Sequence, residues 1–481
     1  MNPMKKPITQ NSGIAKCPTG IRGLDEIIFG GLPRGRPTLL CGGTGCGKTL
    51  LAMEFIVRGI REFNEPGVFM AFEETADELA ANVASLGFDL PALERRKKFA
   101  IDYVRIERSE IEEIGHYNLE GLFVRLAHMI HKVGAKRVAL DSLEALFAGL
   151  SNEAVLRGEL RRLFRWLKDQ RVTAVITAEQ GQNTLTRHGI EEYVSDCVIL
   201  LNHRMINQVA TRHLRVVKYR GSAHGTDEYP TMIDETGLRV LPISSLGLDY
   251  GVTKERVSTG VKALDATFGF KGYFRNSSVL ISGTAGTGKS SLAASFAEAA
   301  CRHGERCLYI AYEEAPAQII RNMASIGLDL SHWVGNGRLQ FHAVRPTYYG
   351  LEQHLVAIHK RLEEFRPTAV VMDPLTNLTP IGTAPEITAM LTRLVDFLKR
   401  RGITAIFTSL TDAQRGQEQT SAGVSSLMDT WLLLRQVENN DDRKRLLYIL
   451  KSRGMAHSSQ VREFLLTDKG IQFHDAAPRD A

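Results

Sequence analysis

Two glycine-rich segments of the chain each end in a lysine followed by a hydroxyl residue. They read GGTGCGKT at residues 42–49 and GTAGTGKS at residues 283–290, and each stands between a short apolar run and a helix-forming stretch. In such loops, glycines let backbone N–H groups curve around phosphates, the lysine reaches the β and γ oxygens, and the hydroxyl binds Mg²⁺. The sequence therefore predicts two sites for ATP and Mg²⁺, formed by Gly43, Thr44, Gly45, Cys46, Gly47, Lys48, Thr49, Thr284, Ala285, Gly286, Thr287, Gly288, Lys289 and Ser290.

An apolar run that ends in an aspartate follows each loop further along the chain. VALD ends at Asp141 and VVMD ends at Asp373. Beside a phosphate-binding loop, a carboxylate at a strand end belongs to the Mg²⁺ shell, together with the hydroxyl of Thr49 or Ser290. An aspartate that only caps the next helix is the alternative, which the upstream loop disfavours.

Two adjacent glutamates end the first apolar run after each loop. They are Glu73 and Glu74 in the first case and Glu313 and Glu314 in the second. One carboxylate of each pair could orient or deprotonate the attacking group. Because neighbouring side chains of a strand point to opposite sides, we expect only one to face the γ-phosphate, and we favour the first. A solvated strand end that leads into a helix is the alternative.

A basic segment occurs twice, as KYRGSAH at residues 218–224 and KSRGMAH at residues 451–457. In a ring, such hairpins could reach the nucleotide of the neighbouring subunit and neutralise phosphate charge. A solvated turn and a DNA-contacting loop are the alternatives. The predicted nucleotide contacts in these segments are Lys218, Tyr219, Arg220, Ser222, His224, Lys451, Ser452 and Arg453.

These motifs recur in one order because the chain is an internal duplication. Thr19 returns as Thr259 and Asp141 as Asp373, at offsets of 240 and 232 residues. In each copy, short apolar runs alternate with helix-length stretches, which predicts an α/β fold with a mainly parallel sheet flanked by helices. We predict domains at 1–245 and 246–481, a linker at 243–254, and strands at 38–41, 68–72, 138–140, 173–176, 278–281, 307–312, 369–372 and 404–407.

Composition limits the class of protein. A length of 481 residues fits two large domains, and no apolar run approaches the ~20 residues that cross a bilayer. The N-terminus lacks the apolar segment of a secretory signal, and the six cysteines form no CxxC pair, so we expect a cytoplasmic protein with reduced thiols. The net charge of +6 suits anionic nucleotides without requiring nucleic acid.

Together these motifs resemble those of the KaiC family, from about residue 16 to residue 472. The doubled T-G-[IV]-x-x-L-D opening, the glutamate pair and the K-x-R-G hairpin carry the resemblance, and the cysteine cluster of zinc-bearing RadA-type proteins is missing. The resemblance implies two tandem RecA-like P-loop NTPase domains in a homohexamer. It implies slow ATP hydrolysis in the first domain and a Ser/Thr autokinase and autophosphatase in the second. It adds Leu50, Ser85 and Arg445 to the ATP contacts.

The resemblance also locates phosphorylation sites in the second copy. Ser425 and Ser426 stand where the family carries its Ser-Thr acceptor pair, and Thr420 stands where a further threonine acceptor lies. The first copy has Glu192 and Tyr193 at the aligned place, so only the second domain is expected to phosphorylate itself.

The same resemblance bears on partners. Residues 105–121 correspond to the segment with which the family engages KaiB, so a KaiB-like partner is compatible with this chain. After Gln472 the chain ends within nine residues and lacks most of the segment through which KaiA acts, so we expect no KaiA dependence.

Two other functions stay open at this point. A RecA-like DNA recombinase or helicase would need basic or aromatic DNA-binding loops, but residues 179–190 contain only Arg187 and His188, and residues 412–423 only Arg415. A nucleotide-gated scaffold without kinase activity would need only the two loops. We therefore expect neither nucleic-acid binding nor membrane association, and favour an ATPase with an autokinase domain.

Overall fold

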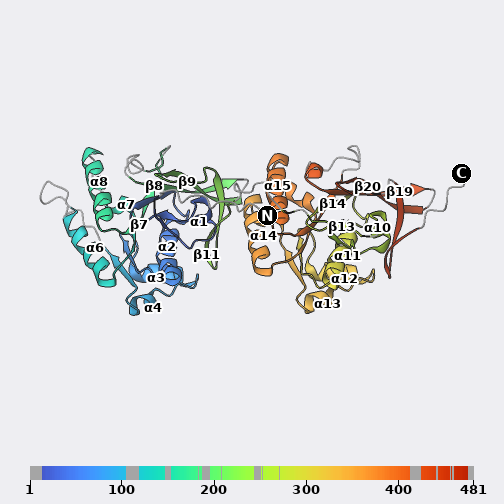
Figure 1. The fold of residues 1–481 in the computed structure, drawn as a ribbon, viewed down its shortest axis with the longest axis horizontal. Helices are drawn as coiled ribbons and strands as arrows, with labels where there is room; N and C mark the ends of the chain where they lie inside the picture. The colour runs from blue at the N-terminus through green and yellow to red at the C-terminus, as the bar shows by residue number, and fades with distance from the viewer. Residues whose placement is uncertain are drawn as a thin grey trace, which may run out of the picture. The chain divides into compact units, whose positions relative to one another are not determined.

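The computed structural model describes residues 14–104, 119–146, 153–181, 184–186, 195–206, 209–242, 251, 253–269, 271–411, 424–439, 442–455, 457 and 460–474. The chain forms two compact units, Met1–Ser245 and Leu246–Ala481. Figure 1 shows that each unit combines a sheet with helices packed along it. None of the helices in these described ranges is long and apolar enough to span a membrane.

The first unit alternates strands and helices. Its elements are β1 (Lys16–Cys17), α1 (Leu24–Ile27), β2 (Leu32–Pro33), β3 (Pro37–Gly42), α2 (Lys48–Phe63), β4 (Gly67–Ala71), α3 (Ala76–Ala84), α4 (Leu90–Arg95), β5 (Phe99–Tyr103), α6 (Glu120–Val133), β6 (Arg137–Asp141), α7 (Leu143–Leu146), α8 (Glu153–Asp169), β7 (Thr173–Glu179), β8 (Cys197–Ile206), β9 (Val209–Tyr219), β10 (Glu228–Asp234) and β11 (Gly237–Val240). The main sheet has the order β11-β10-β9-β8-β3-β7-β6-β4-β5. Strands β8, β3, β7, β6, β4 and β5 are parallel, and β9 to β11 extend the sheet in antiparallel fashion.

The second unit repeats this plan. Its elements are β12 (Arg256–Val257), α10 (Lys262–Thr267), β13 (Tyr273–Phe274), β14 (Ser278–Gly283), α11 (Lys289–Arg302), β15 (Cys307–Ala311), α12 (Pro316–Ala324), α13 (Leu330–Gly335), β16 (Leu339–Ala343), η2 (Pro346–Tyr348), α14 (Leu351–Phe365), β17 (Ala369–Asp373), η3 (Leu375–Ile381), α15 (Ala384–Arg400), β18 (Thr404–Leu410), η4 (Val424–Ser426), β19 (Thr430–Asn439), β20 (Asp442–Ser452), β21 (Arg462–Thr467) and β22 (Gly470–Phe473). Its main sheet has the order β16-β15-β17-β18-β14-β19-β20-β21-β22. This is the order of the equivalent strands in the first sheet, written from the opposite edge.

Helices cover both faces of the first sheet because its central strands are apolar on both sides. Leu40 and Phe69 belong to a buried cluster with residues of α2, whereas Leu39 and Val68 belong to a second cluster with residues of α6 and α8. Successive strand residues thus alternate between two cores, the arrangement that near-continuous apolar strands produce. The predicted α/β class, with a mainly parallel sheet flanked by helices in each copy, is confirmed.

The eight predicted strands all form, with shifted ends. Strands β4 and β15 stop at Ala71 and Ala311, one residue before the ends of the predicted runs, while β7 and β18 continue three residues further. All six cysteines are buried and form no disulfide. Residues 243–250 and 252 of the predicted linker lie outside the described residues.

Candidate nucleotide-binding sites

Each glycine-rich loop connects the central strand of its sheet to a helix. The first joins β3 to α2, and its Gly45 and Gly47 have φ values of 73° and 100°, in the left-handed region that favours glycine. At Gly42 an added Cβ would lie 2.5 Å from Cys46 Sγ and 2.6 Å from the Leu201 carbonyl oxygen. The second loop repeats this geometry, with Gly286 and Gly288 at 77° and 98°. Both loops therefore direct the first turn of a helix, where backbone N–H groups are unpaired, toward a bound anion.

The lysine of each loop folds back over its own backbone. Lys48 Nζ donates to the carbonyl oxygens of Gly42 and Gly43 at 2.9 and 3.0 Å. In the second unit, Lys289 Nζ donates to those of Gly283 and Thr284 at 3.0 and 2.7 Å. Burial lowers the pKa of Lys289 to about 8, although the charges of Asp373 and Glu313 act in the opposite direction. An ammonium group in such a place is ready to exchange carbonyl oxygens for phosphate oxygens.

The two aspartates lie at the carboxyl ends of β6 and β17, and both are held by hydroxyl groups. Asp141 accepts a hydrogen bond from Thr177, and burial raises its pKa while hydrogen bonds from Thr177 and Thr49 lower it. Asp373 accepts from Thr408, and also from Tyr309 at 2.7 Å.

Oxygen donors of this kind suit Mg²⁺, which is usually held by one or two carboxylates together with substrate phosphates. Thr49 and Asp141 would supply them in the first unit, and Ser290, the second residue of α11, and Asp373 in the second. In the described ranges, His, Cys, Asp and Glu side chains form no group of three or more that could hold a metal by themselves. The residues present therefore fit a Mg²⁺ ion that shares its shell with nucleotide phosphates.

The glutamate pairs differ from the expectation in one respect. Because β4 and β15 end at Ala71 and Ala311, all four glutamates lie in the bend after a strand, and strand alternation does not separate them. Hydrogen bonds distinguish them instead. Glu74 accepts from Asn82 at 3.1 Å and Glu314 from Asn322 at 3.0 Å, so the second glutamate of each pair is tied to the following helix.

The first glutamate of each pair interacts electrostatically with a residue of the predicted ATP and Mg²⁺ site. The charge of Glu73 raises the pKa of Asp141, and the charge of Glu313 raises the pKa of Lys289. In the first unit, Ser142 Oγ also donates to Glu73 Oε1 at 2.6 Å. These contacts favour Glu73 and Glu313 as the residues nearest to a γ-phosphate.

The basic hairpin of the first unit lies away from the loop of the same unit. Strand β8 pairs with β3 so that Cys197 is level with Thr38, and Tyr219 pairs with Cys197. Thr38 precedes Gly42 by four residues, which is about 13 Å along a strand. Lys218 and Arg220, which flank Tyr219, therefore lie at the opposite end of the sheet from their own glycine-rich loop.

The other predicted nucleotide contacts of the first unit differ in how accessible their side chains are. The Tyr219 side chain is buried and donates to the Gly31 carbonyl at 2.8 Å, so only its backbone is available to a ligand. Ser222 Oγ accepts from Lys16 at 2.7 Å, and the ring of His224 stacks on Tyr219. Leu50 lies in the first turn of α2, and Ser85 is the exposed C-cap of α3.

The basic hairpin of the second unit lies equally far from the glycine-rich loop of its own unit. Ser452 pairs with Thr430, which is level with Val279, again four residues before the start of the loop at Gly283. By contrast, Arg445 lies beside the loop of its own unit, where its Nε donates to the Gly286 carbonyl at 3.4 Å.

The predicted phosphorylation sites contact the basic hairpin of their own unit. Lys451 Nζ donates to the Ser425 carbonyl at 3.1 Å, and Arg453 donates to the Ser426 carbonyl at 2.8 Å. Ser426 is exposed and Ser425 is partly exposed. Thr420, Glu192, Tyr193 and residues 105–118 lie outside the described residues.

Several residues that surround these sites were missed by the sequence analysis. They are Ser142, Asn82, Asn322, Thr177, Thr408 and Tyr309. The repeat contained a signal for four of them. Asn82 and Asn322 each follow the second glutamate by eight residues, and Thr177 and Thr408 occupy the fifth position of equivalent strands.

Comparison with known proteins finds relatives over nearly the whole chain. The family described as KaiC ATPase matches residues 17–245 and, a second time, residues 257–477. Circadian clock protein KaiC2 of Synechocystis sp. is 55% identical over 97% of this chain and 83% of its own length. Circadian clock oscillator protein KaiC of Synechococcus elongatus is 35% identical over 97% of this chain and 91% of its own length. Circadian clock protein KaiC3 of Synechocystis sp. is 35% identical over 96% and 92% of the two chains.

Proposed function

Because this chain belongs to the KaiC family and is a tandem ATPase of that family, we propose that it works as a homohexameric ring whose second unit phosphorylates its own serines. In this proposal, the unit Met1–Ser245 hydrolyses ATP. The unit Leu246–Ala481 transfers the γ-phosphoryl group of ATP to Ser425 and Ser426.

The observation that supports the ring is the position of each basic hairpin in its own sheet. Lys218, Arg220 and their counterparts lie about 13 Å along the strands from the loop of the same unit, which leaves the phosphates bound there without them. A neighbouring subunit whose loop faces the hairpin would complete the site. Head-to-tail contacts of this kind close into a ring when the rotation between subunits allows it.

The contacts of the acceptor serines support transfer between subunits. Lys451 and Arg453 hold the backbone of Ser425 and Ser426, so a nucleotide bound against this hairpin would lie near the serine hydroxyls. In the transfer, the serine Oγ bonds to the γ-phosphorus while the bond to the β–γ bridging oxygen breaks and ADP leaves. The serine proton passes to Glu313 of the subunit that binds the nucleotide.

In the first unit the same arrangement serves hydrolysis. Glu73 would accept a proton from the attacking water, and Lys48 would neutralise charge on the β and γ oxygens. When Mg²⁺ is bound, held by Thr49 and Asp141 or by Ser290 and Asp373, it supplies further neutralisation of that charge.

The test of the proposed kinase is direct. The purified full chain is incubated with ATP and Mg²⁺, and phosphopeptides are mapped by mass spectrometry while released phosphate is measured in parallel. We expect phosphate on residues 425 and 426 together with slow ATP turnover. Turnover without incorporation would contradict the kinase and leave a nucleotide-gated ATPase.

The ring is tested by measuring the mass of the particle in solution with and without a nonhydrolysable ATP analogue. We expect assembly with nucleotide, and weaker assembly in Lys48→Ala, because subunits meet across a bound phosphate group. A chain that binds the analogue and stays monomeric would contradict the ring.

Partners follow the family in this proposal. Residues 105–121 would engage a KaiB-like protein. Pulldown of a KaiB-like protein by the wild-type chain, with and without ATP, tests this statement.

A further inference from the structure

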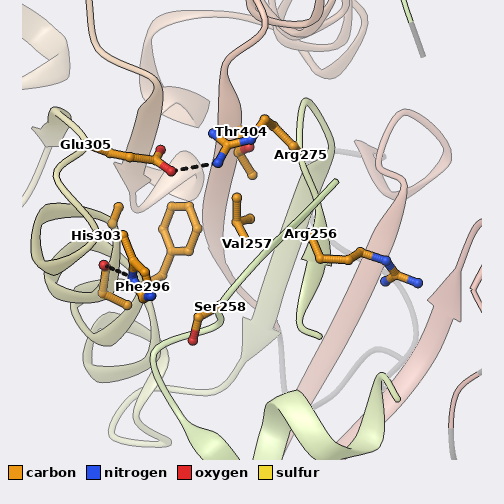
Figure 2. A pocket seen from close by; sticks show the side chains of 10 residues that line it. Arg256, Val257, Ser258, Arg275, Phe296, His303, Glu305 and Thr404 are labelled. Carbon is orange, nitrogen blue, oxygen red and sulfur yellow. Dashed lines mark hydrogen bonds and ion pairs between the residues drawn. The ribbon is translucent and has the colours of Figure 1, made fainter. Parts of the chain in front are cut away.

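A cavity of about 290 Å³ lies in the second unit, away from the nucleotide loop. Figure 2 shows its lining, which includes Ser258, Arg275, Phe296, Glu305 and Thr404. Its wall along α11 runs from Phe296 to the C-cap residue His303, seven or more residues beyond Lys289 on a helix that rises 1.5 Å per residue, about 10 Å or more from the loop. The cavity is therefore separate from the site described above.

The first unit has a buried guanidinium group at the corresponding place. The Arg137 side chain is completely buried at the start of β6 and donates to the carbonyl oxygens of Phe55 and Pro18 at 2.9 and 2.7 Å. It also forms an ion pair with Glu65 at 2.7 Å, and its guanidinium lies over the ring of Phe55. Five N–H donors in a rigid planar fork make this group suited to such a set of acceptors.

The correspondence follows from the duplication. Strands β1, β4 and β6 and helix α2 match β12, β15, β17 and α11, so that the residues in contact with Arg137 can be paired with residues of the second unit. Pro18, Phe55, Gly59 and Glu65 correspond to Ser258, Phe296, Ala300 and Glu305, and all four counterparts line the cavity.

Arginine itself has been replaced in the second unit. The counterpart of Arg137 is Ala369, which is paired with the cavity residue Thr404 in the sheet, as Arg137 is paired with Thr173. A Cβ atom at Gly59 would lie 2.3 Å from Arg137 Cδ, so the first unit needs glycine there, whereas the second unit has Ala300. The two differences are consistent with each other, because alanine is tolerated only where the arginine is missing.

The charged residues around the cavity also differ from those around Arg137. In the first unit, Glu65 is paired with two arginines, Arg34 and Arg137. In the second unit, one arginine, Arg275, is paired with two glutamates, Glu305 and Glu255, each at 2.8 Å. The counterpart of Glu255 is Ala15, which carries no charge. Glu255 does not line the cavity, so the relevant difference lies at the shared glutamate, where Glu305 has one guanidinium partner and Glu65 has two. The other carboxylate oxygen of Glu305 accepts a hydrogen bond from Thr368 at 2.7 Å, so a second cation at this carboxylate would take the place that Arg137 has beside Glu65.

The other arginine of the lining, Arg256, does not take the place of Arg137. Arg256 stacks on the ring of Phe274, with its guanidinium carbon 3.8 Å from the ring centroid, and donates to the Gly272 carbonyl at 2.9 Å. In Figure 2 its guanidinium points away from Glu305 and the other labelled side chains.

We propose that this cavity of the second unit binds a guanidinium group supplied from outside the unit, with Glu305 as its anionic partner. Two sources have this chemistry, a free guanidinium compound such as agmatine and an arginine side chain presented by a polypeptide. In both cases the group would occupy the position that Arg137 occupies in the first unit. Binding at this cavity would require neither ATP hydrolysis nor autophosphorylation.

The test is to measure by calorimetry whether methylguanidinium binds to the full chain, which is first saturated with ATP. We expect saturable binding with a dissociation constant of about 1 mM or lower. An affinity of this order is what charge-assisted hydrogen bonds between one guanidinium group and one carboxylate can supply. Methylammonium, which has the same charge without the planar fork, should bind at least about tenfold more weakly. Agmatine and N-acetyl-arginine amide then distinguish a free compound from an arginine within a chain.

Two cavity variants test whether the guanidinium group binds at this place. The double change Ala369→Arg with Ala300→Gly rebuilds the arrangement of the first unit and should abolish binding. Glu305→Gln should weaken it about tenfold or more, whereas Glu364→Gln, a carboxylate paired with Arg361 outside the cavity, should leave it unchanged. Undetectable binding to the folded wild-type chain, or binding that survives both cavity variants, would overturn the proposal.

Discussion

Ser142 Oγ donates a hydrogen bond to Glu73 Oε1 at 2.6 Å, joining the residue after β6 to the bend after β4. The second unit has Pro374 at the corresponding position, which has no hydroxyl group to offer Glu313. The two proposed catalytic glutamates are therefore held differently, although their surrounding folds are alike. This difference coincides with the proposed division between hydrolysis in one unit and phosphoryl transfer in the other.

Replacing Ser142 with alanine should reduce ATP hydrolysis by about tenfold to a hundredfold, because a hydrogen bond to a charged group contributes roughly 1.5–3 kcal/mol and here orients the carboxylate. Ser142→Thr keeps the hydroxyl and should retain most activity. Phosphate release is measured in a background that carries Lys289→Ala, so that only the ATP site of the first unit is active. Faster hydrolysis in Ser142→Ala would mean that the hydrogen bond restrains Glu73 instead of positioning it.

Glu73→Gln should reduce phosphate release by roughly 10²-fold or more, a loss typical of removing a general base. Glu74→Gln is the matched comparison and should have a smaller effect, because Glu74 is bound to Asn82 on α3. Steady-state phosphate release by both variants decides the assignment. If turnover survives Glu73→Gln, Glu74 or a backbone group holds the attacking water.

The double variant Ser425→Ala with Ser426→Ala should lose most label from [γ-³²P]ATP and keep the hydrolysis of the first unit, because the hydroxyls removed belong only to the second. Added phosphates at this position would bring about two negative charges each to the Lys451 and Arg453 hairpin, giving the ring a phosphorylation-dependent state. Undiminished labelling of the double variant would refute the assignment and make Thr420 the next candidate.

Arg137→Ala should destabilise the first unit by about 3–5 kcal/mol, since it breaks a buried ion pair and leaves the carbonyls of Phe55 and Pro18 without this donor. Denaturant unfolding with a probe in each unit measures the effect. Arg162→Ala removes two ion pairs at the surface of α8, to Glu120 and Glu159, and should cost about 1 kcal/mol or less. Equal costs for the two variants would contradict the assigned role of the buried guanidinium.

Acid should destabilise the second unit through two histidines. Burial lowers the pKa of His342 to about 4, from an ordinary value of 6.5, and burial also lowers the pKa of His354. Between about pH 4 and 6.5 the unfolded chain then binds more protons at these sites than the folded one, so stability falls as the pH falls through this window.

Unfolding of the second unit at pH 7 and pH 5 checks this expectation. His342→Gln should reduce the difference between the two pH values, whereas His131→Gln, an exposed position on α6, should not. An unchanged pH dependence in His342→Gln would assign the acid sensitivity to other groups.

Much of the fold and both glycine-rich loops could be predicted from the sequence because their signals are local. The glycines, Lys48 and Thr49 lie within eight consecutive residues, and the strands of the central sheet are short apolar runs between helix-length stretches. The duplication strengthened each signal, because every motif appeared twice in the same order. The pairs of acidic residues could be located in this way, although not their partners.

Only the tertiary structure decided which of these residues face one another. Ser142 and Glu73 are 69 residues apart, Tyr309 and Asp373 are 64 apart, and Arg137 and Glu65 are 72 apart. Such contacts depend on the order and register of strands joined by long crossovers, which no local pattern encodes. The same register separates each basic hairpin from its own loop, and the same packing buries Arg137 in one unit while forming a cavity over Glu305 in the other.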